Sequence, residues 1–326
     1  MTTLSCFELG ERMLSVAEAH EALLTLVSCP LKPEHVALSE AHGRVLAQDV
    51  TADFDVPRHT NSAMDGIALR WPQDAARQGG AWRRVGEALA GHPYTGCVGD
   101  GECIAITTGA ALPEGADTVI MIEQTSSVGD SVSVHAVERV TPGQHVRQAG
   151  EDLARGQVAL AAGHRLEAAA LGLLASLGIA TVAVRRRPRV AVFSTGDEVT
   201  APGDAVGHAG IYDANRFSLI GLLREQGADV VDLGIVIDDP AALEECLDEA
   251  ARVADLVVSS GGVSVGQADH TKAAVERLGR LTLWRIALRP GRPLACGVLG
   301  ERRVPFLGLP GNPVACLVTA LRFMVP

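Results

Sequence analysis

The sequence is poor in aromatic residues and in basic residues. Phe, Trp and Tyr make up 3% of the 326 residues, and 28 Lys and Arg stand against 39 Asp and Glu, which gives a formal net charge of −11. General nucleic-acid binding needs a broad basic surface, and single strands also need aromatic stacking platforms. The composition therefore argues against a nucleic acid as partner, although an acidic protein can still hold a local basic pocket.

The cysteines lack a pattern, because no two of the seven form a Cys-x-x-Cys pair. Zinc ribbons and disulfide frameworks both rely on regular cysteine spacings, so neither is indicated. We expect reduced and mostly buried thiols. The seven positions are Cys6, Cys29, Cys97, Cys103, Cys246, Cys296 and Cys316.

Long apolar runs are absent as well. No stretch approaches the roughly 18 uninterrupted apolar residues of a membrane-spanning helix. The opening MTTLSCFELGERM has no charged region followed by an apolar run, which a secretory signal would show. We therefore expect a cytoplasmic protein without a membrane partner.

The chain does contain enough apolar residues, 47%, to bury a large core, and its length fits two or three domains. Ser15-Val16-Ala17-Glu18 forms a capping box ahead of helically spaced apolar residues and predicts the first helix. Glycine and proline punctuate short apolar runs over about 50–140, which indicates a β-rich module. Helical and strand-like patterns return over 164–184.

From residue 189 onward, strand-like and helix-like segments alternate. This order predicts an α/β domain with a doubly wound parallel sheet, in which ligands bind beyond the carboxyl ends of the strands. The loops after the strands are therefore the places to search for a site. We predict strands at 189–193, 229–236, 255–259 and 281–287, and helices at 215–226, 240–253 and 270–278.

A glycine- and serine-rich turn, SSGGVSVGQADHTK at 259–272, follows the third of these strands. Glycine allows positive φ and close backbone approach, so successive amides can face an anion such as phosphate, and serine adds hydroxyl donors. We predict backbone amide donors here at Gly261, Gly262 and Gly266 and hydroxyl donors at Ser259, Ser260 and Ser264.

Carboxylates reach the same predicted edge from three loops. Glu198 lies in the loop after the first strand, Asp238 after the second and Asp269 in the turn after the third. Mg²⁺ is typically held by a few such carboxylates together with waters and substrate phosphates. The sequence therefore predicts a magnesium site formed by these three residues.

Positive charge comes from the segment around 285–292, where Arg285, Arg289 and Arg292 can bind oxyanions through their planar guanidinium groups. The stretch Gly308 to Pro313 opens a helix with proline at its first position, so its free amides also face the predicted pocket.

Each of these features alone is more often structural than functional. A glycine-rich turn is ordinary loop chemistry, a lone acid often caps a helix, and scattered arginines usually lie at the surface. Their expected convergence on one sheet edge favours a functional site.

Six ordered motifs make the sequence resemble the molybdopterin molybdenumtransferase family, that is, MoeA and the gephyrin E domain. The resemblance extends from the first helix to the last residue. The motifs are Asn61 to Gly66, Thr108 to Ala110 with Pro113 to Asp117, Phe193 to Glu198, Ile211 to Arg216, Ser259 to Gly266 with Ala268-Asp269, and Gly308 to Pro313.

The resemblance implies insertion of molybdenum from molybdate into adenylylated molybdopterin, with Mg²⁺ and release of AMP. It implies catalytic roles for five acidic or hydroxyl residues and binding roles for residues around the sheet edge. The implied catalytic residues are Asp65, Thr108, Glu198, Asp238 and Asp269. The implied binding residues are Thr195, Gly196, Asp213, Asn215, Ser260, Gly261, Gly262, Ser264, Arg285, Arg289, Arg292, Pro310 and Pro313.

The resemblance also implies a domain plan and partners. Residues 1–49 and 141–184 would form domain I, 50–140 a β-rich domain II and 185–326 the molybdopterin-binding α/β domain III, while a C-terminal β-barrel domain IV would be absent. A homodimer is implied, with a molybdopterin adenylyltransferase and molybdoenzymes as possible partners.

Two alternatives stay open at this point. The chain could be a molybdopterin-binding scaffold without catalysis, which the acids such as Asp65 and Glu198 argue against. It could instead carry a related chemistry of the same α/β domain, such as molybdopterin adenylylation or nucleotide deamidation. The segments preceding that domain, with Asp65 and Thr108, argue against this second reading.

Overall fold

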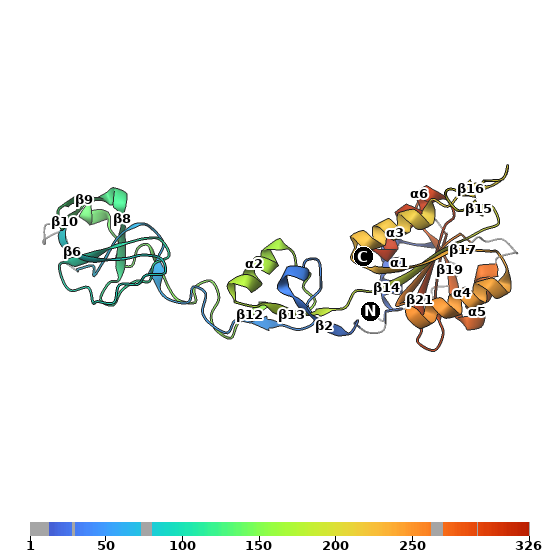
Figure 1. Cartoon of the computed structure of the whole chain (residues 1–326), viewed down its shortest axis with the longest axis horizontal. Coiled ribbons are helices and arrows are strands. Elements are labelled where there is room, and N and C mark those ends of the chain that lie inside the picture. The colour runs from blue at the N-terminus through green and yellow to red at the C-terminus, as the bar shows by residue number, and fades with distance from the viewer. Residues whose placement is uncertain (1–12, 28–29, 73–79, 262–269, 292, 326) are drawn as a thin grey trace. The chain divides into compact units, whose positions relative to one another are not determined.

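The computed structural model describes residues 13–27, 30–72, 80–261, 270–291 and 293–325. The chain folds into two compact units (Figure 1). Unit 1 combines residues 1–35 with 183–326, and unit 2 comprises 36–182. Both crossings between the units fall within the paired strands β2 and β13, so two chain segments connect them.

The centre of unit 1 is a seven-stranded sheet in the order β1-β19-β20-β21-β18-β14-β17. Neighbouring strands are parallel except at β20, which is antiparallel to both β19 and β21. The α/β class is as predicted, but the expectation of a fully parallel sheet is wrong at this strand, because short connections join it to both neighbours. The strands are β1 (Met13–Leu14), β14 (Arg189–Thr195), β17 (Asp229–Val236), β18 (Leu256–Ser260), β19 (Gly279–Ile286), β20 (Pro293–Leu299) and β21 (Val304–Leu309).

Helices cover both faces of this sheet, as Figure 1 shows for α3 and α6 on one side and α4 and α5 on the other. Each face has its own buried core: Leu219 and Phe323 belong to the first, and Phe193 and Leu247 to the second. The doubly wound arrangement is thereby confirmed. The helices are α1 (Val16–Leu24), α3 (Asn215–Glu225), α4 (Pro240–Val253), α5 (His270–Leu278) and α6 (Pro313–Thr319), the last continuing as a π-helix over Ala320–Met324.

Local capping chemistry explains where two of these helices begin. The Ser15 hydroxyl accepts a hydrogen bond from the backbone N–H of Glu18 at 3.2 Å, and the Glu18 carboxylate accepts one from the Ser15 N–H at 2.8 Å. This is the predicted capping box. At α4 the Asp239 carboxylate accepts from the N–H groups of Ala241 and Ala242, and Pro240 occupies the first turn.

Unit 2 contains a six-stranded sheet in the order β8-β5-β7-β6-β10-β9, with an apolar core on each face. Gly66 starts its strand β5 where a Cβ would lie 1.8 Å from the carbonyl oxygen of Ile120, so no larger residue fits there. The sheet strands are β5 (Gly66–Leu69), β6 (Ala81–Ala88), β7 (Glu102–Ile106), β8 (Thr118–Met121), β9 (Thr125–Val128) and β10 (Ser131–Val134).

Short strand pairs and one α-helix complete the described part of unit 2. The helix α2 (Ala168–Ser176) lies where the sequence predicts one. The paired strands are β3 (Val50–Thr51) with β12 (Val158–Leu160), β4 (Asn61–Ser62) with β11 (Val146–Arg147), and β2 (Pro33–Ala37) with β13 (Thr181–Arg185).

The five described cysteines are free thiols, and three of them, Cys103, Cys296 and Cys316, are buried. Burial raises the pKa of both Cys103 and Cys316 to about 11, so these thiols are protonated and unreactive at neutral pH. The prediction of reduced and mostly buried cysteines is confirmed for these positions. Within the described ranges, the helices are all too short or too polar to cross a membrane.

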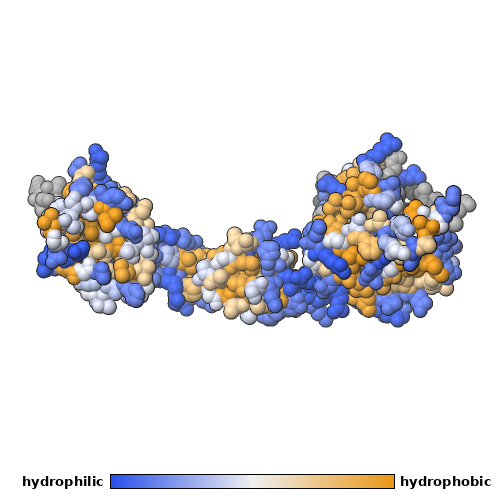
Figure 2. Space-filling model, turned by 45° about the horizontal axis from the view of Figure 1, so that its top comes forward, coloured by the Kyte–Doolittle hydropathy of each residue, from blue (hydrophilic) through white to orange (hydrophobic). Residues whose placement is uncertain are grey.

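Hydrophobic side chains also reach the surface of unit 1, where orange patches cover part of the visible face (Figure 2). Helix α6 and its continuation expose Val314, Leu317 and Leu321, whose spacing places them on one side of the helix. Contiguous exposed apolar side chains often mark a contact with another molecule.

We expect Asp239→Ala to lower the free energy of unfolding by about 1 kcal/mol, because two N–H groups at the start of α4 lose their acceptor. Urea denaturation followed by far-UV circular dichroism measures this. The matched control is Asp238→Ala, which removes the adjacent carboxylate but leaves the cap in place. Equal losses in both variants would contradict the assignment of the cap to Asp239.

Candidate functional site

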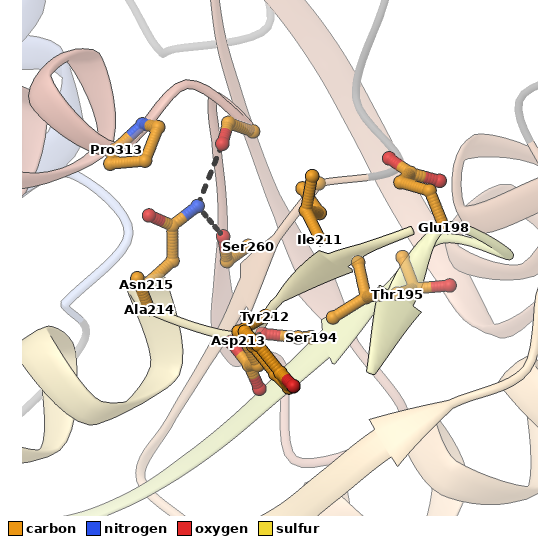
Figure 3. Close-up of a pocket in the computed structure, with 13 residues that line it drawn as sticks. Ser194, Thr195, Glu198, Ile211, Tyr212, Asp213, Ala214, Asn215, Ser260 and Pro313 are labelled. Atoms are coloured by element: carbon orange, nitrogen blue, oxygen red, sulfur yellow. Dashed lines mark hydrogen bonds between the residues drawn. The ribbon is translucent and has the colours of Figure 1, made fainter. Parts of the chain in front are cut away.

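A pocket lies where strands β14 and β18 end, and it encloses about 390 Å³ of empty space including the part open to solvent (Figure 3). The residues around it are Ser194, Thr195, Glu198, Val199, Ile211, Tyr212, Asp213, Ala214, Asn215, Ser260, Gly261, Gly311 and Pro313.

The register of the parallel strands brings these residues together. Ser194 on β14 pairs with Ser260 on β18, and Ser260 pairs with Leu309 at the end of β21. The loops that follow all three strands therefore leave the sheet at one edge, as the sequence predicts. Seven of the predicted site residues line the pocket: Thr195, Glu198, Asp213, Asn215, Ser260, Gly261 and Pro313.

Asn215 ties two of these loops together. Its side-chain amide donates to the Ser260 hydroxyl at 2.7 Å and to the Gly311 carbonyl at 2.8 Å, the two dashed contacts in Figure 3. Asn215 is also the first residue of α3, so the start of this helix is fixed against the ends of β18 and β21.

Gly261 is the point of closest backbone approach in the pocket. It adopts φ +86°, and a Cβ at this position would lie 2.6 Å from the carbonyl oxygen of Thr195. Its N–H donates to the carbonyl of Leu309 at 3.2 Å. Only glycine satisfies both the conformation and the space, which is the reason sequence analysis gave for this residue.

Glu198 presents its carboxylate at the edge of the pocket. The preceding Gly196 has φ +141°, and a Cβ there would lie 2.8 Å from the Glu198 carboxylate. Val199 N–H donates to the Gly196 carbonyl at 3.0 Å and closes the turn. Glu198 is exposed, and among the described residues its carboxylate has no hydrogen-bond or ion-pair partner, so it is available to a ligand.

Asp213, by contrast, is buried and already bonded within the protein. Its carboxylate accepts from the Ser194 hydroxyl at 2.9 Å and from Arg216 Nε at 2.7 Å. Arg216 Nη1 in turn donates to both carboxylate oxygens of Asp232 at 2.6 Å. Burial opposes the charge on Arg216, but these two carboxylates raise its pKa above the usual value. Asp213 therefore forms the wall of the pocket.

Sequence reasoning did not assign roles to Ser194, Arg216 and Asp232. A signal was present for Arg216, since an acid three residues before an arginine at a helix start can form a local ion pair. For Asp232 the sequence contains no such signal, because Asp232 lies on strand β17 and contacts Arg216 of helix α3 only through the tertiary fold.

Parts of the predicted magnesium and phosphate sites fall outside the described residues, namely Asp269, Gly262 and Ser264. Asp238 is half-buried, follows the end of β17 and does not line the pocket. Over the ranges that the structure describes, no three His, Cys, Asp or Glu side chains gather closely enough to hold a metal ion. The grouping of Glu198 and Asp238 with Asp269 stays a prediction.

The predicted arginines belong to the same sheet edge but to more distant strands. Arg285 lies near the end of β19 and Arg289 in the loop that follows, and both are exposed. Two strands, β20 and β21, separate β19 from β18, which corresponds to roughly 14 Å at normal strand spacing. Arg292 lies outside the described residues. These positions suit the far end of an extended ligand.

The loop before α6 supplies the remaining predicted residues. Pro310 is buried directly after β21, and Pro313 lines the pocket as the first residue of α6. Asn312 caps this helix by accepting a hydrogen bond from the Ala315 N–H at 3.1 Å.

Asp65 and Thr108 lie together in unit 2. The Asp65 carboxylate accepts from the Thr108 backbone N–H at 2.7 Å and from its hydroxyl at 2.9 Å. The backbone bond first, and the hydroxyl bond second, hold the pKa of Asp65 below its ordinary value. Both residues are exposed, so this ionised carboxylate is accessible to a ligand.

Comparison with known protein families gives two matches that together span most of the chain. Residues 14–178 match the model described as MoeA N-terminal region (domain I and II). Residues 191–326, which include the whole pocket, match the one described as probable molybdopterin binding domain.

Individual relatives agree with these matches. A molybdopterin molybdenumtransferase from Haemophilus influenzae is 40% identical over 96% of this chain and 76% of its own length, and one from Nostoc sp. is 39% identical over 90% and 68%. Gephyrin from Dictyostelium discoideum is 31% identical over 90% of this chain and 46% of its own length.

Solved structures show the same likeness. A crystal structure of the molybdopterin biosynthesis MoeA protein from Pyrococcus horikoshii superposes with a TM-score of 0.80 at 28% identity, covering 96% of this chain and 78% of that one. A further crystal structure of a Pyrococcus MoeA protein has a TM-score of 0.76 at 32% identity, with 97% and 79% covered.

We expect Thr108→Val to raise the pKa of Asp65 part of the way towards its ordinary value of 3.8, because the hydroxyl bond is lost while the larger backbone bond remains. An NMR titration that follows the side-chain carboxyl carbon of Asp65 measures this pKa. Both proteins keep Asp65 ionised at neutral pH, so they differ only in acid, below the ordinary pKa. Thr108→Ser keeps the hydroxyl and should titrate like the wild type; an unchanged midpoint in Thr108→Val would contradict the contribution of the hydroxyl.

Proposed function

The chain belongs to the MoeA family, and we propose that it is a molybdopterin molybdenumtransferase, which inserts molybdenum from molybdate into adenylylated molybdopterin and releases AMP. One observation carries the proposal: the pocket at the ends of β14 and β18 lies within the region that matches a molybdopterin-binding domain. It presents the exposed carboxylate of Glu198, which has no partner among the described residues, beside glycine and hydroxyl groups. Family members of this name align over most of the chain.

The pocket offers donors for the phosphates of such a substrate. The start of α3 is not one of them, because the Asp213 carboxylate lies there and already accepts a hydrogen bond from the Arg216 N–H at 3.2 Å. The hydroxyls of Thr195 and Ser260 and the turn at Gly261 line the same space. We assign these groups to phosphate binding, with Gly262 and Ser264 as predicted additions.

The arginines Arg285 and Arg289, with Arg292, are assigned to the molybdate or to the distal part of the substrate. The guanidinium groups of Arg285 and Arg289 are exposed and can bind an oxyanion in a forked geometry. An overall acidic protein needs such a local positive charge to hold an anionic substrate.

A magnesium ion would fit the donor chemistry of the pocket. Mg²⁺ is commonly held by one or two carboxylates with substrate phosphates and waters, and Glu198 is an exposed carboxylate at the pocket edge. Asp238 and Asp269 are the other proposed ligands. When bound, the ion would neutralise phosphate charge and polarise the phosphoanhydride. The protein's own groups orient the phosphates.

Asp65 and Thr108 are proposed to act in the same reaction, because they match a family motif and Thr108 keeps the Asp65 carboxylate ionised and oriented. We further propose that the protein works as a cytoplasmic homodimer. The apolar residues that α6 exposes on unit 1 support an association of this kind. An enzyme that adenylylates molybdopterin must supply the substrate, and molybdoenzymes would consume the product.

The direct test is AMP release from adenylylated molybdopterin by the purified protein with Mg²⁺, in the presence and absence of molybdate. We expect molybdate-dependent release for the wild type and a loss of about 100-fold for Glu198→Gln, because the variant lacks the charge at the reacting phosphates. Asp197→Asn alters the neighbouring exposed acid of the same turn and should keep wild-type activity. Binding of the substrate without molybdate-dependent turnover would favour a scaffold instead.

Replacement of Arg289 should affect molybdate more than the pterin. We expect Arg289→Ala to raise the molybdate concentration for half-maximal AMP release roughly tenfold, because charged hydrogen bonds to the oxyanion are lost. Arg224→Ala, at the opposite end of α3, is the control and should leave this concentration unchanged. A wild-type molybdate dependence in Arg289→Ala would return Arg289 to the class of solvated surface charges.

A further inference from the structure

A buried arginine connects the edge strand of unit 1 to the pocket. Arg216, in the first turn of α3, is 7% exposed and bridges two carboxylates. Its Nε donates to Asp213 at 2.7 Å, and its Nη1 donates to both oxygens of Asp232 at 2.6 Å. A guanidinium group is planar and keeps its donors at fixed angles, so it sets the distance between the two acids.

A bulge in β17 places Asp232 for this contact. Val192 pairs with Asp232 and Ser194 pairs with Ile235, so one residue of β14 faces two residues of β17. Gly234, in the bulge, adopts φ +74°, and its N–H donates to the Asp232 carboxylate at 3.0 Å. Bulges of this kind redirect a side chain and are frequent beside functional sites. The proposed pocket does not use Asp232 directly.

We propose that Arg216, held by Asp232, is a positioning residue that fixes the pocket in its binding geometry. This inference rests on the proposed function for its activity readout. Neither residue lines the pocket, so both act through Asp213. The two acids share one arginine, so loss of either removes one of the two carboxylate partners of a buried guanidinium group.

Asp213 connects Arg216 to two parts of the pocket, the first of which contains Ser260. Its carboxylate accepts from the Ser194 hydroxyl and from the Arg216 N–H, which anchors it to the end of β14 and to the first turn of α3. Asn215, between Asp213 and Arg216 in sequence, is then placed to bond Ser260 and Gly311. The side of the pocket formed by the Ser260 hydroxyl and the Asn215 amide thus depends on the ion pairs of Arg216.

The second part of the pocket that Asp213 contacts is the segment that carries Glu198. The Asp213 N–H donates to the Thr200 carbonyl at 3.0 Å, and the Ile211 N–H donates to the Glu198 carbonyl at 2.8 Å. These bonds pair β15 (Val199–Thr200) with β16 (Ile211–Tyr212) in parallel register. The segment 196–214 begins after β14 and ends before α3. Asp213 holds these two points together through its bonds to Ser194 and Arg216. A shift of Asp213 would move the backbone that carries Glu198.

The experiment compares Asp232→Asn with Asp255→Asn. Asp255 accepts two hydrogen bonds of 2.7 Å from Arg186. It directly precedes β18 and so lies at the amino-terminal ends of the parallel strands, whereas the pocket lies at their carboxyl ends. Both substitutions remove one charge from an arginine–carboxylate pair of unit 1. The Asp255 side chain is 15% exposed and that of Asp232 is 41% exposed, so the control disturbs the more buried of the two carboxylates. Only the first pair leads to the pocket.

For Asp232→Asn we expect kcat/KM for AMP release to fall about tenfold or more, because sub-ångström displacement of binding groups is costly for a reaction. Asp255→Asn should stay within about twofold of the wild type in kcat/KM, as expected for a change away from the pocket. Arg216→Lys should resemble Asp232→Asn, since an ammonium group cannot bridge both acids.

Hydrogen exchange of the ligand-free protein provides a readout that does not require activity. Amides in 196–214 should exchange faster in Asp232→Asn than in the wild type, while Asp255→Asn should leave this segment unchanged. Equal exchange of 196–214 in both variants, or equal kcat/KM in both, would overturn the inference. If the wild type releases no AMP but the exchange difference is present, the proposed function fails and the positioning role of Arg216 stands.

Discussion

The pocket depends on the close approach of the chain at Gly261 to the end of β14. The turn after β18 passes so near the Thr195 carbonyl that a single additional carbon would lie 2.6 Å from it. Because of this approach, Thr195, Ser260 and Gly261 line one pocket. The bond from the Gly261 N–H to the Leu309 carbonyl adds the end of β21 to the same edge. Every other feature of the pocket is arranged around this contact of three strand ends.

Buried charge then determines which groups stay available to a ligand. Asp213 and Glu198 both line the pocket, but Asp213 is bonded to Ser194 and Arg216, whereas Glu198 has no partner among the described residues. The same residue type, a carboxylate, thus serves as scaffold in one case and as a candidate ligand in the other. The difference arises from burial: a desolvated carboxylate requires partners within the protein, while an exposed one is satisfied by water until a ligand replaces it. Asp65 in unit 2 represents an intermediate case, since it is exposed but oriented by Thr108.

Much of the fold could be predicted from the sequence, because local patterns determine it. The capping box at Ser15 and the strand-helix alternation after residue 189 specify the elements of unit 1 nearly to their observed bounds. The antiparallel direction of β20 could not be predicted, since an apolar strand has the same pattern in either direction and only its pairing partners distinguish the two.

By itself, the sequence determined the class of the α/β unit and the edge at which the pocket lies, because parallel strands followed by glycine and polar residues must end on one side of a sheet. It also identified Glu198, Ser260 and Gly261 by their chemistry. Only the tertiary structure decided that Asp213 is a buried anchor and that Asp232 belongs to its network. Those roles depend on a bulge in β17 and on a contact between a helix and a strand, and such through-space relations leave no local periodicity to read.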